Sequence, residues 1–352
     1  MADGSASASP PSFSPHQYHR DAIKSSVRNT AANRRREQAL AIGKERREAL
    51  MRAKRVCRAP LSGSDEAVAE DGDMVIDEGK ADLEARTTQA VEELKSALSS
   101  QGKGAQKRKI ELLEAAWCLT NIAAGEPEET KSLLPALPLL IAHLGEKSST
   151  LVAEQCAWAI GNVAGEGAEL RSTLLAQDQA LSSLIKCLKS DNRVLKKEAS
   201  WAMSNIAAGS FEHKKLIFAS EATPLLMHLL RTAQFDIRRE AAYTLGNLCV
   251  VPAGSGNPPN IIVEHLVAIV DGGALPGFIN LVRSADIESA RLGLQFLELV
   301  MRGYPNSQGP KLVEAEDGIE AMERFQFHEN EVMRTMANGL VDKYFGEDYG
   351  LE

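Results

Sequence analysis

The chain has 352 residues and a formal net charge of −8, and no apolar run reaches the ~18 residues of a membrane span, so no membrane partner is expected. Its five scattered cysteines form no Cys-x-x-Cys pair, which fits reduced thiols rather than a disulfide framework or a zinc site. Because its histidines are dispersed and no phosphate-loop, dinucleotide-binding or hydrolase motif is present, we expect a protein that is not an enzyme, with neither cofactor nor metal.

Charge and composition divide the chain into five segments. Residues 1–19 are rich in Ser, Pro and Ala and are expected to be disordered. Residues 20–58, the basic arm, hold 13 Lys/Arg against 4 Asp/Glu, a local charge of +9, so the rest of the chain carries −17. Residues 59–80 form an acidic linker expected to be flexible, residues 81–345 form a repeat region, and residues 346–352 form an acidic tail. A basic arm on an acidic body can bind an acidic partner or fold back onto the acidic body of its own chain.

The repeat region predicts an all-α fold, because apolar helical faces recur and no β pattern is found. A partial first repeat is expected near residues 83–98. Later helices begin near Pro138 and Pro224, and longer helices are expected to stop at Gly125, Gly165 and Gly209. Residues 251–260 form a Pro/Gly-rich insertion, and residues 311–345 form a capping repeat. We predict a right-handed armadillo superhelix of about five to six repeats, the first one truncated.

One five-residue pattern, aromatic-x-x-x-Asn, recurs through these repeats. The three tryptophans of the chain and one tyrosine are spaced by 41, 43 and 42 residues. We call the eight residues of this pattern the ladder: Trp117, Asn121, Trp158, Asn162, Trp201, Asn205, Tyr243 and Asn247. Because residues i and i+4 share a helix face, each pair is expected to face one side of the array. The ladder is expected to stop at Asn247, since the next repeat places Gly293 and Leu297 at these positions.

The chemistry of the ladder suits an extended basic peptide. A carboxamide both donates and accepts, so it can pair with peptide backbone, while indole rings favour Lys and Arg between them. The residues three positions before each aromatic are mostly acidic: Glu114, Gln155, Glu198 and Glu240. The alternative is that the aromatic residues only fill the core and the Asn residues only cap turns.

These residues resemble the importin alpha family, in which a basic importin-beta-binding segment precedes about ten armadillo repeats. The resemblance implies importin-beta binding and autoinhibition by part of the arm: Arg28, Arg34, Arg35, Arg36, Arg46, Arg47, Arg52, Lys54 and Arg55. It implies a major cargo-signal site at Trp117, Asn121, Gly125, Thr130, Gln155, Trp158, Asn162 and Glu166. It implies a minor cargo-signal site at Glu198, Trp201, Asn205, Glu240, Tyr243 and Asn247.

The sequence departs from that family in length, because the third major-site pair is absent and the chain passes after Arg171 directly to minor-site-like repeats. Our main hypothesis is a nuclear-import adaptor that shuttles between cytoplasm and nucleus, with basic nuclear localisation signals and importin beta as partners and an export receptor at its last repeat. One alternative is a truncated regulatory form that binds importin beta but little cargo. Another is a general armadillo scaffold whose arm binds nucleic acid or an acidic surface; under the main hypothesis no direct nucleic-acid binding is expected.

Overall fold

The computed structural model describes residues 85, 88–89, 91–92, 95–96, 105–125, 127–145, 148–251 and 260–346. Residues 1–19, the basic arm and the acidic linker lie outside the described residues. Nearly all of the acidic tail, residues 346–352, lies outside them as well. All numbered helices belong to one compact unit, residues 54–352. The few described residues between 85 and 96 are helical, which is compatible with the expected partial first repeat.

The described residues form repeats of three helices each, with no strand among them. The long third helices are α3 (Ala105–Ile122), α6 (Thr150–Glu166), α9 (Arg193–Ala207), α12 (Phe235–Leu248), α15 (Ile287–Gly303) and α18 (Glu331–Phe345). The second helices are α5 (Leu137–Ala142), α8 (Ala180–Leu188), α11 (Ala222–Thr232), α14 (Leu275–Val282) and α17 (Gly318–Glu323). The first helices are α4 (Pro127–Lys131), α7 (Ala168–Leu175), α10 (Phe211–Phe218), α13 (Asn260–Asp271) and α16 (Gly309–Ala315). Short 3₁₀ helices are η1 (Leu134–Ala136) and η2 (Pro305–Ser307).

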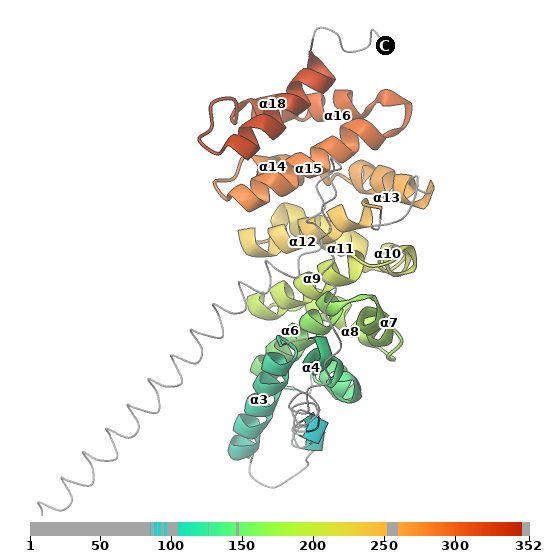
Figure 1. Cartoon of the computed structure of the whole chain (residues 1–352), viewed down its shortest axis with the longest axis vertical. Coiled ribbons are helices and arrows are strands. Elements are labelled where there is room, and N and C mark those ends of the chain that lie inside the picture. The colour runs from blue at the N-terminus through green and yellow to red at the C-terminus, as the bar shows by residue number, and fades with distance from the viewer. Residues whose placement is uncertain are drawn as a thin grey trace, which may run out of the picture. The chain divides into compact units, whose positions relative to one another are not determined.

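The long helices stack in chain order from α3 to α18, each in contact with the next, as Figure 1 shows for successive repeats. Each long helix from α6 onward also packs on the second helix of its own repeat, and the second helices from α8 to α17 contact one another in turn. The array is therefore built of layers that grow by addition of repeats, which is the organisation of a solenoid. The predicted all-α armadillo fold is confirmed.

Polar caps start several of the long helices. Ser149, Asn192, Asp286 and Asn330 each precede a long helix and accept a hydrogen bond from the backbone N–H three residues later. Such N-caps satisfy an amide that the helix itself leaves unpaired. The expected helix stop at Gly165 is wrong, because α6 continues through Glu166 and Gly167 follows it in extended backbone.

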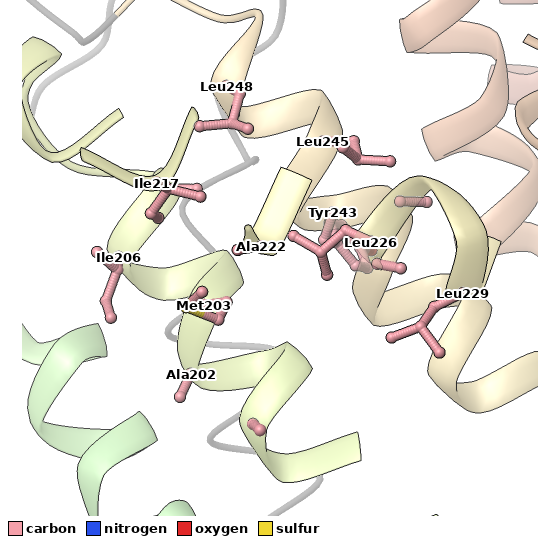
Figure 2. Close-up of a cluster of buried hydrophobic side chains, with 14 of the residues drawn as sticks. Ala202, Met203, Ile206, Ile217, Ala222, Leu226, Leu229, Tyr243, Leu245 and Leu248 are labelled. Carbon is pink, nitrogen blue, oxygen red and sulfur yellow. The ribbon is translucent and has the colours of Figure 1, made fainter. Parts of the chain in front are cut away.

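The core between the layers is made of small and branched apolar side chains. Alanines on the long helices, such as Ala202 and Ala241, are fully buried and permit close helix approach. Figure 2 shows part of this core, where side chains of α9, α10, α11 and α12 meet. The labelled members are Ala202, Met203, Ile206, Ile217, Ala222, Leu226, Leu229, Tyr243, Leu245 and Leu248.

The end of the ladder at Asn247 has a steric cause. Gly293 of α15 lies so close to α14 that an added Cβ would meet the carbonyl oxygen of Phe278 at 2.8 Å and Cγ2 of Val282 at 2.6 Å. An aromatic side chain therefore has no room at this position. Leu297, at the Asn-equivalent position, is fully buried.

No single helix in the described part of the chain is long and apolar enough to cross a membrane. The pair α13 and α14 passes the same length and composition test only together, and the two helices are bent by 82° relative to each other.

Candidate functional site

The four ladder pairs lie on four consecutive long helices, α3, α6, α9 and α12. Their exposure decreases from the first pair to the later ones. Trp117 is half-buried and Asn121 is exposed, whereas Trp158 is 8% exposed, Trp201 is 0% exposed and Tyr243 is 6% exposed. Tyr243, the aromatic of the fourth pair, packs in the hydrophobic core (Figure 2).

Three ladder asparagines join neighbouring repeats through hydrogen bonds. Asn162 Nδ2 donates to the Thr120 carbonyl at 3.3 Å, Asn205 Nδ2 to the Gly161 carbonyl at 2.9 Å, and Asn247 Nδ2 to the Ser204 carbonyl at 2.9 Å. Each acceptor is the residue just before the preceding ladder asparagine, so the same bond repeats at each step. Asn121 donates within its own helix, to the Trp117 carbonyl at 3.0 Å.

This series shows that the asparagines stabilise repeat stacking. A carboxamide has two N–H donors and an oxygen that accepts, so one bond does not use up its capacity. The asparagines were expected from sequence to be either ligand contacts or turn caps. Three of them instead make inter-repeat bonds, and among the ladder asparagines Oδ1 of Asn162 is a buried oxygen without a hydrogen-bond partner.

Trp201 packs directly on the backbone of the preceding repeat. A Cβ added to Gly161 would lie 2.5 Å from Cε3 of Trp201, a distance that real Cβ atoms do not tolerate. The absence of a side chain at Gly161 therefore lets the indole ring lie against α6. Gly161 was not among the expected site residues, although its position just before Asn162 is visible in the sequence.

Three expected site residues carry buried polar atoms without a hydrogen-bond partner. These atoms are Oε1 of Gln155, Oδ1 of Asn162 and Nε1 of Trp201. Native proteins pair the great majority of such atoms, since an unpaired one costs about 1–3 kcal/mol. Two acceptors on α6 and one donor on α9 are the groups that an extended peptide backbone, with its alternating N–H and C=O groups, can satisfy.

Two of the expected carboxylates are buried beside the later ladder pairs. Glu198 is 1% exposed and Glu240 is 0% exposed, while Glu114 is exposed. Arg239 lies near Glu240, with Nε 3.6 Å from Oε1. Buried carboxylates require compensation by cations or donors, and Arg239 is one such cation beside Glu240.

A second series of side chains caps the C-terminal ends of the ladder helices. Thr130 Oγ1 donates to the Ala123 carbonyl at 3.2 Å, Arg171 Nε to the Ala164 carbonyl at 2.8 Å, and Lys214 Nζ to the Ala207 carbonyl at 2.6 Å. In the next repeat His265 Nδ1 lies 3.1 Å from the Leu248 carbonyl. Cations at helix C-termini also interact favourably with the helix dipole. Thr130, expected at the cargo site, belongs to this buried capping series.

Burial and neighbouring charge lower the pKa of Arg171 and His265 in the capping series and of His213 beside Arg171. Burial lowers the pKa of the Arg171 guanidinium. Burial, followed by the nearby Arg171, lowers the pKa of His213, whose Nε2 lies 3.2 Å from Ser172 Oγ. Burial lowers the pKa of His265, which stacks on Phe218 with ring centroids 3.9 Å apart.

The remaining expected site residues are placed more peripherally. Gly125 lies in the turn after α3, where its N–H donates to the Ile122 carbonyl, and Glu166 is the last residue of α6. The arginines and Lys54 of the basic arm lie outside the described residues. In the part of the chain that the structure describes, no three His, Cys, Asp or Glu side chains are grouped to hold a metal ion.

Comparison with known proteins agrees with this arrangement. Residues 111–163 match a HEAT-like repeat model, and residues 169–208 and 210–250 match armadillo/beta-catenin-like repeats. The chain is 57% identical to importin subunit alpha-2 of Oryza sativa subsp. japonica, with 100% of both chains covered. It is 43% identical to importin subunit alpha-9 of Arabidopsis thaliana, covering 95% of this chain and 98% of that protein. The chain belongs to the importin alpha family.

Solved structures support the same fold. A designed armadillo repeat protein in complex with the peptide (KR)4 superposes with a TM-score of 0.59 at 26% identity, covering 73% of this chain and 98% of the designed one. This importin alpha is thus a nuclear-import adaptor built from armadillo repeats. Its relatives are nucleocytoplasmic transport factors, and these relatives and the designed armadillo protein are not enzymes.

This importin alpha is shorter than its rice relative. The alignment with that protein spans 527 positions, whereas the chain has 352 residues, so at least 175 positions have no counterpart here. At 42 residues per repeat, the step from Trp201 to Tyr243, this gap corresponds to about four repeats.

Proposed function

We propose that this importin alpha binds basic nuclear localisation signals along its ladder and binds importin beta through residues 20–58. When importin beta is absent, the basic arm occupies the ladder and inhibits cargo binding. The adaptor shuttles between cytoplasm and nucleus, and an export receptor binds its last repeat, α16 to α18.

The observation that carries the proposal is the set of buried polar atoms without partners on the ladder helices. Oε1 of Gln155 and Oδ1 of Asn162 can accept from backbone N–H groups, and Nε1 of Trp201 can donate to a carbonyl. Of the three side chains, Gln155 has no hydrogen bond or packing contact described above, so packing alone would favour an apolar side chain of the same shape there. Their presence is explained if a ligand completes their hydrogen bonds.

Charge supports a basic ligand over a neutral one. The body of the chain carries −17 outside the basic arm, and Glu198 and Glu240 are buried next to ladder aromatics. The designed armadillo protein with a similar fold is seen with an alternating Lys/Arg peptide. The basic arm, with +9, matches the same requirement and can reach the ladder through a 22-residue linker that spans about 26 Å as a coil.

A specific observation favours a second candidate function. At least 175 aligned positions have no counterpart here, a length equal to about four repeats, and we infer that repeats are what this chain lacks. If too few repeats remain for useful affinity, the protein is a regulatory form that binds importin beta but little cargo. The general scaffold with a nucleic-acid-binding arm is not favoured by the family relationship.

The test is peptide binding by Gln155→Met in the full-length protein. To relieve inhibition, the measurements use an arm variant in which Arg34, Arg35, Arg36, Lys54 and Arg55 are replaced by Ala. Met has a volume similar to Gln but lacks the unpaired oxygen, so the substitution should leave the free energy of unfolding unchanged or raise it. The same substitution should weaken the binding of a labelled Lys/Arg peptide about two- to tenfold. Asn280→Ala, at an exposed position of α14, is the matched control.

Each outcome separates the candidates. Weaker binding by Gln155→Met with an unchanged unfolding midpoint supports the cargo site, and tighter binding by the arm variant than by the native chain supports autoinhibition. If neither protein binds the peptide at physiological salt while the native chain still binds importin beta, the regulatory form is the function. Binding to DNA that falls steeply with salt, without an importin-beta complex, would favour the scaffold.

A further inference from the structure

We propose that the two cargo-signal sites implied by the family resemblance are joined here into one continuous site, which selects a single uninterrupted basic segment. This inference rests on the proposed function and adds the class of peptide that the ladder takes. It concerns the junction between α6 and α9, where major-site-like residues are followed directly by minor-site-like residues.

The ladder bonds cross this junction without any change. Asn205 Nδ2 lies 2.9 Å from the Gly161 carbonyl across the junction, and Asn247 Nδ2 lies 2.9 Å from the Ser204 carbonyl at the next step. Trp201 packs against Gly161 in the same contact. The step from Trp158 to Trp201 is 43 residues, which is one repeat.

Contacts at other points of the same repeats show that the junction is an ordinary repeat interface. Near the N-terminal end of α9, Asn192 Nδ2 donates to Oε1 of Glu154 at 2.9 Å. Between second helices, Cys187 Sγ lies 3.8 Å from the Leu144 carbonyl. Helices α6 and α9 therefore meet as directly as α9 and α12 do, and no repeat intervenes.

The buried polar atoms without partners lie on both sides of this junction. Gln155 and Asn162 are on α6, and Trp201 is on α9. Packed helices lie about 8–10 Å apart, and an extended peptide advances about 3.3 Å per residue, so one ladder step corresponds to about three residues. A peptide that lies beside Asn162 on α6 therefore reaches the level of Trp201 on α9 within about three residues.

The geometry sets the length and pattern of the ligand. Four ladder pairs span three steps, or about 24–30 Å, which is covered by about eight to ten extended residues. Glu114 lies beside the first pair, and Glu198 and Glu240 lie beside the last two, so basic residues are favoured along the whole segment. A neutral spacer of 12 residues, about 40 Å when extended, exceeds the ladder and would have to loop out.

The experiment compares peptides on the full-length arm variant at physiological salt. One peptide has nine contiguous Lys/Arg residues, and a second has the same residues in two clusters separated by a 12-residue Gly/Ser spacer. The two isolated clusters are the controls. We expect the contiguous peptide to bind at least about tenfold tighter than the spaced one, and the spaced one to bind within about threefold of its better cluster.

Two substitutions on opposite sides of the junction provide a second readout. Gln155→Met and Trp201→Phe each remove one unpaired polar atom and keep most of the side chain. Both are expected to weaken the contiguous peptide by about two- to tenfold. Gln155→Met should leave the unfolding midpoint unchanged. Trp201→Phe should lower it, because the smaller ring leaves a cavity beside Gly161, so binding is measured where both variants are fully folded. Sensitivity to only one of them would overturn the continuous site.

The outcomes distinguish this inference from the function on which it rests. A spaced peptide that binds ten times tighter than either cluster, and as tightly as the contiguous one, would overturn the inference while the cargo-binding function stands. Absence of binding by every basic peptide would overturn both. The expected order of affinities, together with sensitivity on both sides of the junction, supports both.

Discussion

Gly161→Ala tests the packing of the ladder at its junction. The new Cβ would lie 2.5 Å from Cε3 of Trp201 and within overlap of Cζ3, so the indole must move. Overpacking of this kind costs about 1–3 kcal/mol, while replacing a helical Gly by Ala returns up to about 1 kcal/mol. The net effect on the free energy of unfolding is a loss of up to about 2 kcal/mol.

Gly246 is the matched control because it holds the same position, just before Asn247. There an added Cβ meets nothing nearer than Cδ1 of Leu292 at 3.9 Å. Gly246→Ala should therefore stabilise the protein by up to about 1 kcal/mol. The two variants are predicted to differ by about 1–3 kcal/mol, which is the cost of overpacking alone.

Urea unfolding followed by circular dichroism and by tryptophan fluorescence is the assay. All three tryptophans belong to the ladder, so fluorescence reports displacement of Trp201 in the folded Gly161→Ala protein. Because repeat arrays can unfold in more than one step, midpoints from the two probes are compared for each variant. Equal stability of the two variants, with unchanged fluorescence, would refute the contact between Trp201 and Gly161.

Three further predictions concern the capping series and the thiols. Lys214→Met removes the hydrogen bonds to the Ala207 and Asn247 carbonyls, so it should lower the free energy of unfolding by about 1–3 kcal/mol. Urea titration measures this loss, and an unchanged unfolding midpoint would contradict the capping role of Lys214. Since burial lowers the pKa of His213 in the folded protein, the unfolded chain binds a proton more readily, and the free energy of unfolding should fall as the pH drops below about 6.5. His213→Gln should reduce this dependence of stability on pH by at most about 1.4 kcal/mol per pH unit. An identical pH profile for the variant would exclude His213 as the cause. Burial raises the pKa of Cys249 to about 12, so iodoacetamide at pH 8 should modify half-buried Cys118 before Cys249, as measured by peptide mass spectrometry. Equal rates at these two residues would show that the Cys249 thiol is accessible.

The repeat and its ladder could be predicted because they depend on local, periodic signals. The Trp-x-x-x-Asn pattern at steps of 41 to 43 residues specified a helical repeat, and the Gly293 and Leu297 positions correctly marked the end of the ladder. Helix ends were less predictable. Gly165 was expected to stop its helix, but α6 continues to Glu166, because a glycine alone does not end a helix that packs well.

The roles of individual ladder residues depended on contacts between repeats. Sequence places Asn162, Asn205 and Asn247 on one face, yet only the packed array brings each within hydrogen-bond distance of a carbonyl about 42 to 44 residues earlier. The hydrogen bond from Lys214 to the Ala207 carbonyl could not be predicted either. The spacing of seven residues is visible in the sequence, but only the packed helices bring the two groups together.

The sequence by itself determined the fold class and the family, because periodicity and composition are local properties of the chain. Only the tertiary structure decided which polar atoms are used between repeats and which remain without a partner. Burial depends on the neighbouring repeat, as the 0% exposure of Trp201 against Gly161 shows. The continuity of the ladder from α6 to α9 is likewise a property of packing, since spacing along the chain does not establish a bond across an interface.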